Sequence, residues 1–367
     1  MEYSAKTFFK WLVCALLLTA VLPSCGMMED DLSDCPYGLY LTFKYDYNLE
    51  RADMFNDHVG SVTLYIFDAD ERLVAVREES NAGGVSPLKD KNYSMHITDL
   101  APGVYKFIAL AGQRPYADMM ADNRAKFVRS DMPSGCGMSS LGIQLDRVDR
   151  GDGVYDVVNN SLPLDSLWHG METGGFEVSA TSPTYGTISL MRDTKKINVT
   201  MRELDDPTEM DIANYEMTIT DRNSTLLWDN SVDETTGTVV YRPYVAWNTY
   251  DRTPASDPDG NPLDDAGKIG HAEFMTSRIV YHDNPADDGV LLVKSRLTGK
   301  IVASLNLPDV LSRLSGNDDM HRYTPQEFLD RGYDYQIDLF LKGDKWAYLN
   351  VGISVLGWSK RIQAEEL

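Results

Sequence analysis

The stretch Leu39-Tyr40-Leu41-Thr42-Phe43-Lys44-Tyr45 decides the class of fold. Its odd-numbered positions hold large apolar or aromatic side chains, and its even-numbered positions hold Tyr, Thr and Lys. This alternation with a period of two is typical of a strand that buries one face. A second run, Ser61-Val62-Thr63-Leu64-Tyr65-Ile66-Phe67, is apolar on both faces, as expected in the middle of a sandwich.

Short runs of the same kind recur along the chain, and helical patterns are few. We expect three hairpins, which join residues 62–66 to 73–76, 93–97 to 104–110, and 335–341 to 346–358. A short helix is expected over 324–330, because Thr324 can cap it, Pro325 suits the first helical position and Glu327 completes a capping box. Regularly spaced strands with turn residues between them predict an all-β protein of two tandem antiparallel β-sandwiches. We place these domains at residues 37–190 and 191–367.

The N-terminus has the layout of a secretory signal peptide. Lys6 and Lys10 precede the apolar run Trp11–Val21, and Leu22-Pro23-Ser24-Cys25 follows it. The apolar run is about half of the ~20 residues that a spanning helix needs. We therefore predict that residues 1–24 are removed and that Cys25 becomes the lipidated first residue of a tether over 25–36. The acidic cluster Glu29-Asp30-Asp31 favours display on the outer face of the outer membrane.

Two cysteines remain once Cys14 leaves with the signal and Cys25 carries lipid. A disulfide between Cys35 and Cys136 would close a loop of roughly 100 residues and stabilise the fold by up to ~4–5 kcal/mol in the chain-entropy model. The alternative is that both are small buried hydrophobic residues. The sequence leaves this choice open.

Charge and motifs exclude several classes of function. The formal net charge is −22, which repels nucleic acid, and no basic patch interleaved with aromatic residues offsets it. The sequence has no Gly-x-Ser-x-Gly, no His-Glu-x-x-His and no phosphate-binding glycine-rich loop, and its six histidines are scattered. We therefore predict a protein that is not an enzyme, has no catalytic residues and needs no cofactor or metal.

These features together are similar to the fimbrillin-associated anchor family of type V fimbriae, the FimB-like lipoproteins. The resemblance spans nearly the whole chain in the order of the family, and it is thinnest between residues 205 and 320. The segments that carry it are Leu22–Cys25, Asp34-Cys35-Pro36, Leu41–Asp46, Ser61–Asp68, Pro102-Gly103-Val104-Tyr105, Ala111-Gly112, Leu167-Trp168-His169-Gly170, Met191-Arg192, Lys196–Val199 and Val351–Trp358.

The resemblance implies two transthyretin-like sandwiches, anchored by acyl chains to the outer membrane, that hold the base of a fimbrium and end its growth. The implied partners are fimbrial stalk subunits, which polymerise by strand exchange. A sheet that lacks an edge strand offers unpaired backbone groups and an apolar slot, and a donated strand satisfies both. The strand near Leu39–Tyr45 would stay in place because it is continuous with the tether.

The C-terminal run offers two interpretations. Leu349, Val351, Ile353 and Val355 alternate with small or polar residues, as in an ordinary strand. The sharper hypothesis is that this segment is a donor strand whose four aliphatic side chains fill a groove in the next subunit. Two other functions remain as alternatives: a surface lipoprotein that binds glycans, and a fimbrial tip or accessory adhesin. Exposed coplanar aromatic side chains would favour the first, and release of the N-terminal strand by an arginine-directed protease would favour the second.

Overall fold

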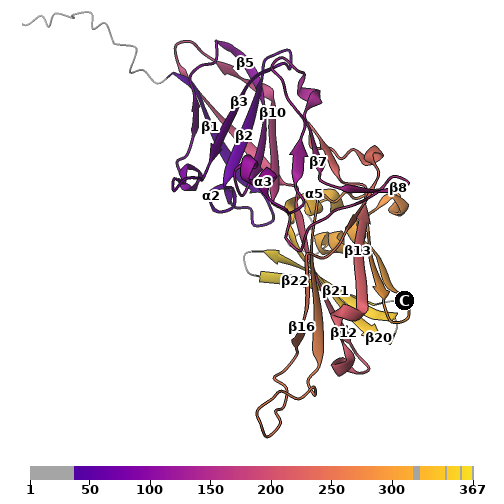
Figure 1. The fold of residues 1–367 in the computed structure, drawn as a ribbon. Helices are drawn as coiled ribbons and strands as arrows, with labels where there is room; N and C mark the ends of the chain where they lie inside the picture. Colours follow the sequence, from indigo (N-terminus) through magenta and orange to yellow (C-terminus); the bar gives the residue numbers. More distant parts are fainter. Residues whose placement is uncertain (1–36, 317–322, 344, 356–357, 366–367) are drawn as a thin grey trace, which may run out of the picture.

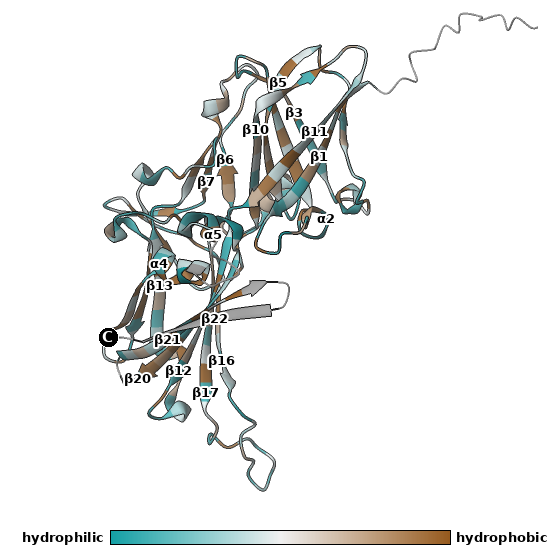
Figure 2. Cartoon of the chain, turned by 180° about the vertical axis from the view of Figure 1, so that it is seen from behind, coloured by the Kyte–Doolittle hydropathy of each residue, from teal (hydrophilic) through white to brown (hydrophobic). Residues whose placement is uncertain are grey.

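The computed structural model describes residues 37–316, 323–343, 345–355 and 358–365. Strands dominate, and the sheet of the first half lies at the opposite end of the molecule from the long hairpin of the second half (Figure 1). The predicted all-β class is confirmed. Figure 2 shows hydrophobic residues concentrated along the strands, while the loop of the long hairpin is hydrophilic. Among the described residues, no helix is long and apolar enough to cross a membrane.

The first half forms one seven-stranded sheet in the order β3-β2-β5-β10-β11-β1-β4. Leu41 of β1 and Leu64 of β2 belong to one buried cluster although three strands separate them in the sheet. The sheet therefore curls on itself and closes a core. Its strands are β1 (Gly38–Tyr47), β2 (Ser61–Phe67), β3 (Leu73–Ser80), β4 (Met95–Ile97), β5 (Gly103–Gly112), β10 (Leu167–Val178) and β11 (Pro183–Arg192).

The second half packs two six-stranded sheets against each other. Side chains such as Val199 and Ile219, one from each sheet, share a buried cluster. The first sheet has the order β16 (Val245–Tyr250), β17 (Lys268–Thr276), β12 (Lys195–Glu203), β20 (Asp334–Lys342), β21 (Lys345–Val355) and β22 (Trp358–Glu365). The second has the order β19 (Ile301–Asn306), β18 (Val290–Ser295), β13 (Tyr215–Asp221), β15 (Thr238–Tyr241), β9 (Val154–Asp156) and β8 (Val148–Gly151).

Two strand pairs cross the division that we place between residues 190 and 191. Strand β9 joins β15 of the second half, and β14 (Thr225–Leu227) joins β7 (Gly142–Leu145) and β6 (Phe127–Arg129) of the first. The two-domain division remains a proposal, with these pairs linking its parts. Short helices fill the connections: α2 (Phe55–His58), α3 (Tyr116–Ala121), α4 (Leu307–Ser312), α5 (Pro325–Arg331) and single turns such as η5 (Ile212–Asn214).

The predicted local elements have mixed outcomes. The hairpins β2–β3 and β20–β21 are confirmed, and so is α5, where the Thr324 hydroxyl accepts from the Glu327 N–H at 3.2 Å. The hairpin predicted from 93–97 and 104–110 is wrong: β4 pairs with β1, because β2 and β10 occupy both edges of β5. The strand predicted over 346–358 is β21, which ends at Val355, and a further antiparallel strand, β22, begins at Trp358. Three pairs are parallel within otherwise antiparallel sheets: β1–β11, β12–β20 and β9–β15.

Candidate functional site

Strand β1 is held on both of its edges. Residues Gly38–Lys44 pair in parallel with Pro183–Ser189 of β11, and Leu39–Leu41 pair with Met95–Ile97 of β4. The inward side chains Leu39, Leu41, Phe43 and Tyr45 are at most 4% exposed. Strand β4 covers only Leu39–Leu41 on one edge, but β1 fills the position beside β11 and its side chains fill the core, so the first half is complete with its own N-terminal strand.

The loop after β1 is closed by hydrogen bonds. The Asp53 carboxylate accepts from the backbone N–H groups of Tyr45 and Phe55, at 3.0 and 3.1 Å. Asn48 donates to the carbonyls of Tyr45 and Ala52. Arg51 is exposed at the tip, and its Nε donates to the Tyr323 hydroxyl at 3.0 Å. An arginine therefore follows β1 directly, in a segment that these contacts fix.

The passage from β11 to β12 is a buried joint, formed by Arg192, Asp193, Thr194 and Lys195. The Lys195 side chain is fully buried, and its Nζ donates to the backbone carbonyls of Arg192, Asp330 and Gly332, each at 2.9 Å. Burial lowers the pKa of Lys195. Three N–H donors meet three acceptors, so the ammonium is satisfied without a charged partner in contact.

Charged and aromatic groups from distant segments complete the joint. Arg278 and Asp330 form a two-point ion pair with both N–O distances at 2.8 Å. Burial raises the pKa of Asp193, whose Oδ1 accepts from Asn230 at 2.9 Å. The Arg192 guanidinium lies 5.3 Å from the ring centre of Trp168, a fully buried residue of β10. These contacts tie the first half to the second at the covalent crossing.

The second sandwich holds another buried polar cluster. Asp221 accepts from the Asn223 amide at 2.9 Å, and burial raises the pKa of Asp221 to about 7. The His282 ring lies between two carboxylates, with Nδ1 at 2.9 Å from Asp288 and Nε2 at 2.6 Å from Glu234. Burial opposes protonation of His282, but the two carboxylates raise its pKa. Within the part of the chain that the structure describes, no group of three or more acidic, His or Cys residues is arranged to hold a metal ion.

The predicted donor residues lie within the second sandwich. Leu349, Val351 and Ile353 are each 1% exposed, and β21 pairs with β20 on one side and β22 on the other. The side chain of Val355 lies outside the described residues. This placement is that of an ordinary strand, while transfer to another subunit stays a prediction.

The predicted cysteine sites are mostly beyond the described part of the chain. Cys25 and Cys35 lie outside the described residues. Cys136 is a half-buried thiol whose Sγ lies 3.8 Å from the Met132 sulfur. Lipidation of Cys25 and the Cys35–Cys136 disulfide therefore stay predictions.

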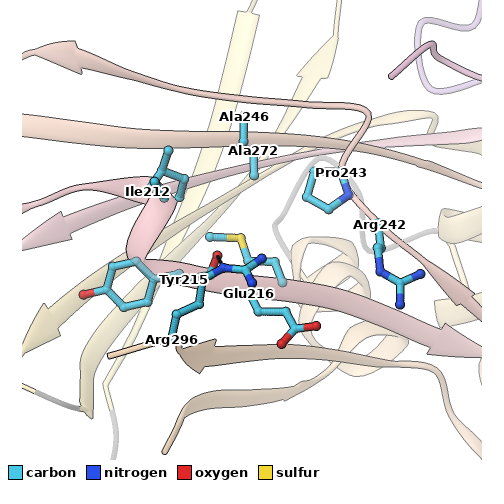
Figure 3. A pocket seen from close by; sticks show the side chains of 10 residues that line it. Ile212, Tyr215, Glu216, Arg242, Pro243, Ala246, Ala272 and Arg296 are labelled. Carbon is cyan, nitrogen blue, oxygen red and sulfur yellow. Dashed lines mark hydrogen bonds between the residues drawn. The ribbon is translucent and has the colours of Figure 1, made fainter. Parts of the chain in front are cut away.

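Sequence reasoning missed a pocket at the edge of the second sandwich. It has a volume of about 430 Å³ and lies between β13 on one side and β16 with β17 on the other (Figure 3). Ala246 and Ala272 point into it from above in this view. The lining residues are Ile212, Ala213, Tyr215, Glu216, Met217, Arg242, Pro243, Ala246, Ala272 and Arg296. They come from four separate stretches of the chain, 212–217, 242–246, 272 and 296, so no local motif marks the site.

An aromatic ladder crosses the outer face of the first sheet. Tyr40 of β1 stacks on His96 of β4, with ring centres 4.0 Å apart, and on Tyr185 of β11, at 5.3 Å. Tyr185 is 71% exposed. These rings stack face to face and are not coplanar, so the feature that would favour glycan binding is present only in part, as the exposed ring of Tyr185.

Comparisons with known proteins agree with this architecture. A candidate adhesin from Bacteroides thetaiotaomicron is 27% identical with a TM-score of 0.69, over 90% of this chain and 100% of that one. A candidate polysaccharide-binding protein from the same organism is 26% identical with a TM-score of 0.66, over 89% and 99%. The fimbrial anchor protein Mfa2 from Porphyromonas gingivalis is 16% identical with a TM-score of 0.55, over 89% and 99%, and shows the shared fold. No curated protein matches the chain.

Residues 32–364 match the family described as fimbrillin-A associated anchor proteins Mfa1 and Mfa2. The match covers most of the chain and agrees with the resemblance found in the sequence. This chain therefore belongs to the fimbrillin-A associated anchor protein family.

Proposed function

We propose that this protein is a lipid-anchored structural protein that attaches a fimbrium to the outer membrane and terminates its growth. Membership of the anchor family makes it a fimbrium-associated surface protein. The finer role rests on β1, whose inner side chains are buried and which pairs with β11 over most of its length and with β4 at Leu39–Leu41. A strand that fills its own groove leaves no place for the strand of another subunit, and growth stops there.

The tether supplies the membrane side of this function. A chain that carries acyl groups at Cys25 enters the fold at β1 within about a dozen residues. Anchoring by two or three acyl chains is stable, whereas a single chain binds only marginally. The proposed partners are fimbrial stalk subunits on one side and the lipid of the outer membrane on the other.

Deletion and complementation test the proposal. Deleting the gene should lengthen fimbriae and shed them into the medium, and the wild-type protein should restore short, attached fimbriae. Complementation with Cys25→Ala should leave the protein and its fimbriae in the medium. Attached fimbriae of normal length in the deletion strain would refute both the anchoring and the termination role.

The donor-strand hypothesis for Leu349, Val351, Ile353 and Val355 needs its own experiment. Burial of each aliphatic side chain is worth roughly 1.5–3 kcal/mol wherever it packs. Because the first three residues already pack in this protein's own core, removal from Leu349 onward should cost several kcal/mol of its stability. Truncation before Trp358 removes β22 but keeps all four residues, so it is the control for loss of the C-terminal strand alone. A folded truncation before Leu349 that fails to retain fimbriae, with the control normal, supports donation; misfolding or normal retention removes the support for it.

The aromatic ladder supports a second candidate function, glycan binding. One of the two similar Bacteroides thetaiotaomicron structures is described as a candidate polysaccharide-binding protein. The open face of Tyr185 could stack on a sugar ring, as exposed aromatic residues do in ligand sites. Titration of purified polysaccharides against the wild type and Tyr185→Ala, with Val148→Ala as an exposed control, tests this. Binding that is lost only in Tyr185→Ala would favour the glycan function.

Arg51 bears on the remaining alternative, a tip or accessory adhesin. Cleavage after Arg51 would separate β1 and the tether from the rest of the chain. An arginine-specific protease should cut the native protein slowly, since the loop is fixed by Asp53 and Asn48. Rapid cleavage that leaves the remainder folded would favour the adhesin.

A further inference from the structure

Strand β16 is an open edge of the second sandwich. It is the first strand of its sheet, and all six of its residues are exposed, including Val245 (40%), Trp247 (38%) and Tyr250 (48%). An exposed edge strand rich in β-branched and aromatic residues is a template for pairing with another chain. The Trp247 ring stacks on His271 of β17, with ring centres 4.8 Å apart, and this contact holds the strand in shape.

The free backbone groups of β16 can be assigned by register. Asp251 donates its N–H to Gly267 at 2.8 Å, which makes this opposed position a hydrogen-bonded pair. Such pairs alternate with non-hydrogen-bonded pairs in an antiparallel ladder. The N–H and C=O groups of Ala246, Asn248 and Tyr250 therefore point away from β17, toward the open edge.

The pocket lies directly beneath this edge. Ala246 of β16 and Ala272 of β17 line it on one side, and Tyr215 and Glu216 of β13 lie on the other (Figure 3). The alanines leave space that a larger side chain would occupy, so the volume of about 430 Å³ can accept apolar side chains from outside. Side chains of a strand added to β16 would alternate, with every second one facing this space.

The lining of the pocket carries two arginines, Arg242 and Arg296, and one carboxylate, Glu216. Arg242 is paired with Asp156 at 2.6 Å. The Nε of Arg296 donates to the Tyr215 carbonyl at 3.2 Å, and among the described residues no carboxylate pairs with its exposed guanidinium. A carboxylate on the bound segment would complement Arg296 with charge-assisted hydrogen bonds.

We propose that β16 and the pocket beneath it form a docking site for an extended segment of a partner protein. The segment adds as a strand along Ala246, Asn248 and Tyr250, places an apolar side chain in the pocket and sets a carboxylate against Arg296. The inference deepens the proposed function and rests on it for the partner, a fimbrial subunit. The hairpin lies at the end of the molecule opposite the start of β1 (Figure 1).

Synthetic peptides provide the test with the purified protein. The probe is a capped peptide of alternating Val and Thr with a terminal Glu, compared with a version ending in Lys and a version N-methylated at every second residue. We expect the Glu peptide to bind, the Lys peptide to bind about tenfold more weakly, and the N-methylated peptide to lose binding because it cannot pair with the edge. Binding is followed by fluorescence anisotropy.

Protein variants separate the contacts. Arg296→Glu should weaken binding of the Glu peptide about tenfold and make the protein prefer the Lys peptide. Lys294→Glu makes the same change of charge at the exposed position of β18, which does not line the pocket, and should leave binding unchanged. Ala246→Pro removes one N–H at the open edge and should abolish binding. Since N-methylation of the peptide blocks the same pairing without altering the protein, a misfolded Ala246→Pro leaves the test intact.

The outcomes distinguish this inference from the proposed function. Equal binding of the Glu and N-methylated peptides, or insensitivity to Arg296→Glu, would overturn the docking site. If deletion of the gene sheds the fimbriae but the Arg296→Glu variant still retains them, the anchor function stands and the docking site is rejected. If the Arg296→Glu variant fails to retain fimbriae while the Lys294→Glu variant retains them normally, the result supports both the anchor function and the docking site.

Discussion

Phe43→Ala should loosen β1 and expose the loop behind it to proteolysis. The Phe43 side chain is 4% exposed, and its ring stacks on Phe55 with centres 5.8 Å apart. Truncation of a buried Phe to Ala costs about 3–5 kcal/mol, a large part of the 5–15 kcal/mol that stabilises a typical domain. Loss of β1 altogether would remove four buried side chains at roughly 1.5–3 kcal/mol each, so the first half should not fold without it.

Two measurements follow this change. Urea denaturation, monitored by the fluorescence of buried tryptophan, should show an unfolding free energy lower by about 3–5 kcal/mol. Cleavage after Arg51 by an arginine-specific protease requires local opening, and its rate follows the population of the open form. Since each 1.4 kcal/mol is a factor of ten, cleavage should accelerate more than a hundredfold if β1 opens as a unit.

Lys44→Ala is the matched control, because Lys44 is the next residue along β1 and its side chain is exposed. Surface substitutions of this kind change stability by about 0.5 kcal/mol or less. Equal stability and equal cleavage rates for Phe43→Ala and Lys44→Ala would refute the claim that the buried side chains of β1 hold this strand in its sheet.

Three further predictions concern the tether, the cysteines and pH. Cys25→Ala should abolish acyl labelling and release the protein from the membrane; a mutant that stays bound would contradict lipid anchoring. Non-reducing peptide mapping should link Cys35 to Cys136, and two alkylatable thiols in the unreduced, unfolded protein would show that the disulfide is absent. Because the folded pKa of Asp221 is raised to about 7, its contribution to stability is present at low pH and falls by about 1.4 kcal/mol from pH 6 to pH 8. The raised pKa of His282 acts in the same direction, and urea titrations should show a flatter pH dependence for Asp221→Asn than for the wild type.

Local patterns predicted the strands well and their partners poorly. The alternation over residues 39–45 placed Leu39, Leu41 and Phe43 on the buried face, as the structure has them. Nothing near this run specifies β11 as its neighbour, where Thr42 meets the Thr187 hydroxyl at 2.8 Å across 145 residues of chain. The turn at Pro102-Gly103 indicated that the strands before and after it pair with each other. In the structure, β4 pairs with β1 instead of β5.

The joint and the pocket also could not be predicted from local sequence patterns. A run of charged residues from Arg192 to Lys196 suggests a solvated linker, yet Lys195 is buried because carbonyls of residues 330 and 332 reach it. Alanines at 246 and 272 carry no functional pattern, and they line a pocket because β16 and β17 bring them together. Side chains that work through distant partners leave no periodic signal in the sequence.

The parallel pairs suit the proposed function, in which this protein would carry load between a tether and a fimbrium. Tension on the tether would pull β1 from its N-terminal end, while β11 leaves through the joint at its C-terminal end. Since these two strands are parallel, opposite pulls load all of their pairs in shear instead of opening them one at a time. If a partner holds β21, as the donor-strand hypothesis has it, the same geometry recurs beyond the joint, because load would enter β12 at its start and leave the parallel β20 at its end. An antiparallel pair pulled through the same connections would open from one end, so the two parallel pairs along this route are where the fold best resists the force that an anchor must bear.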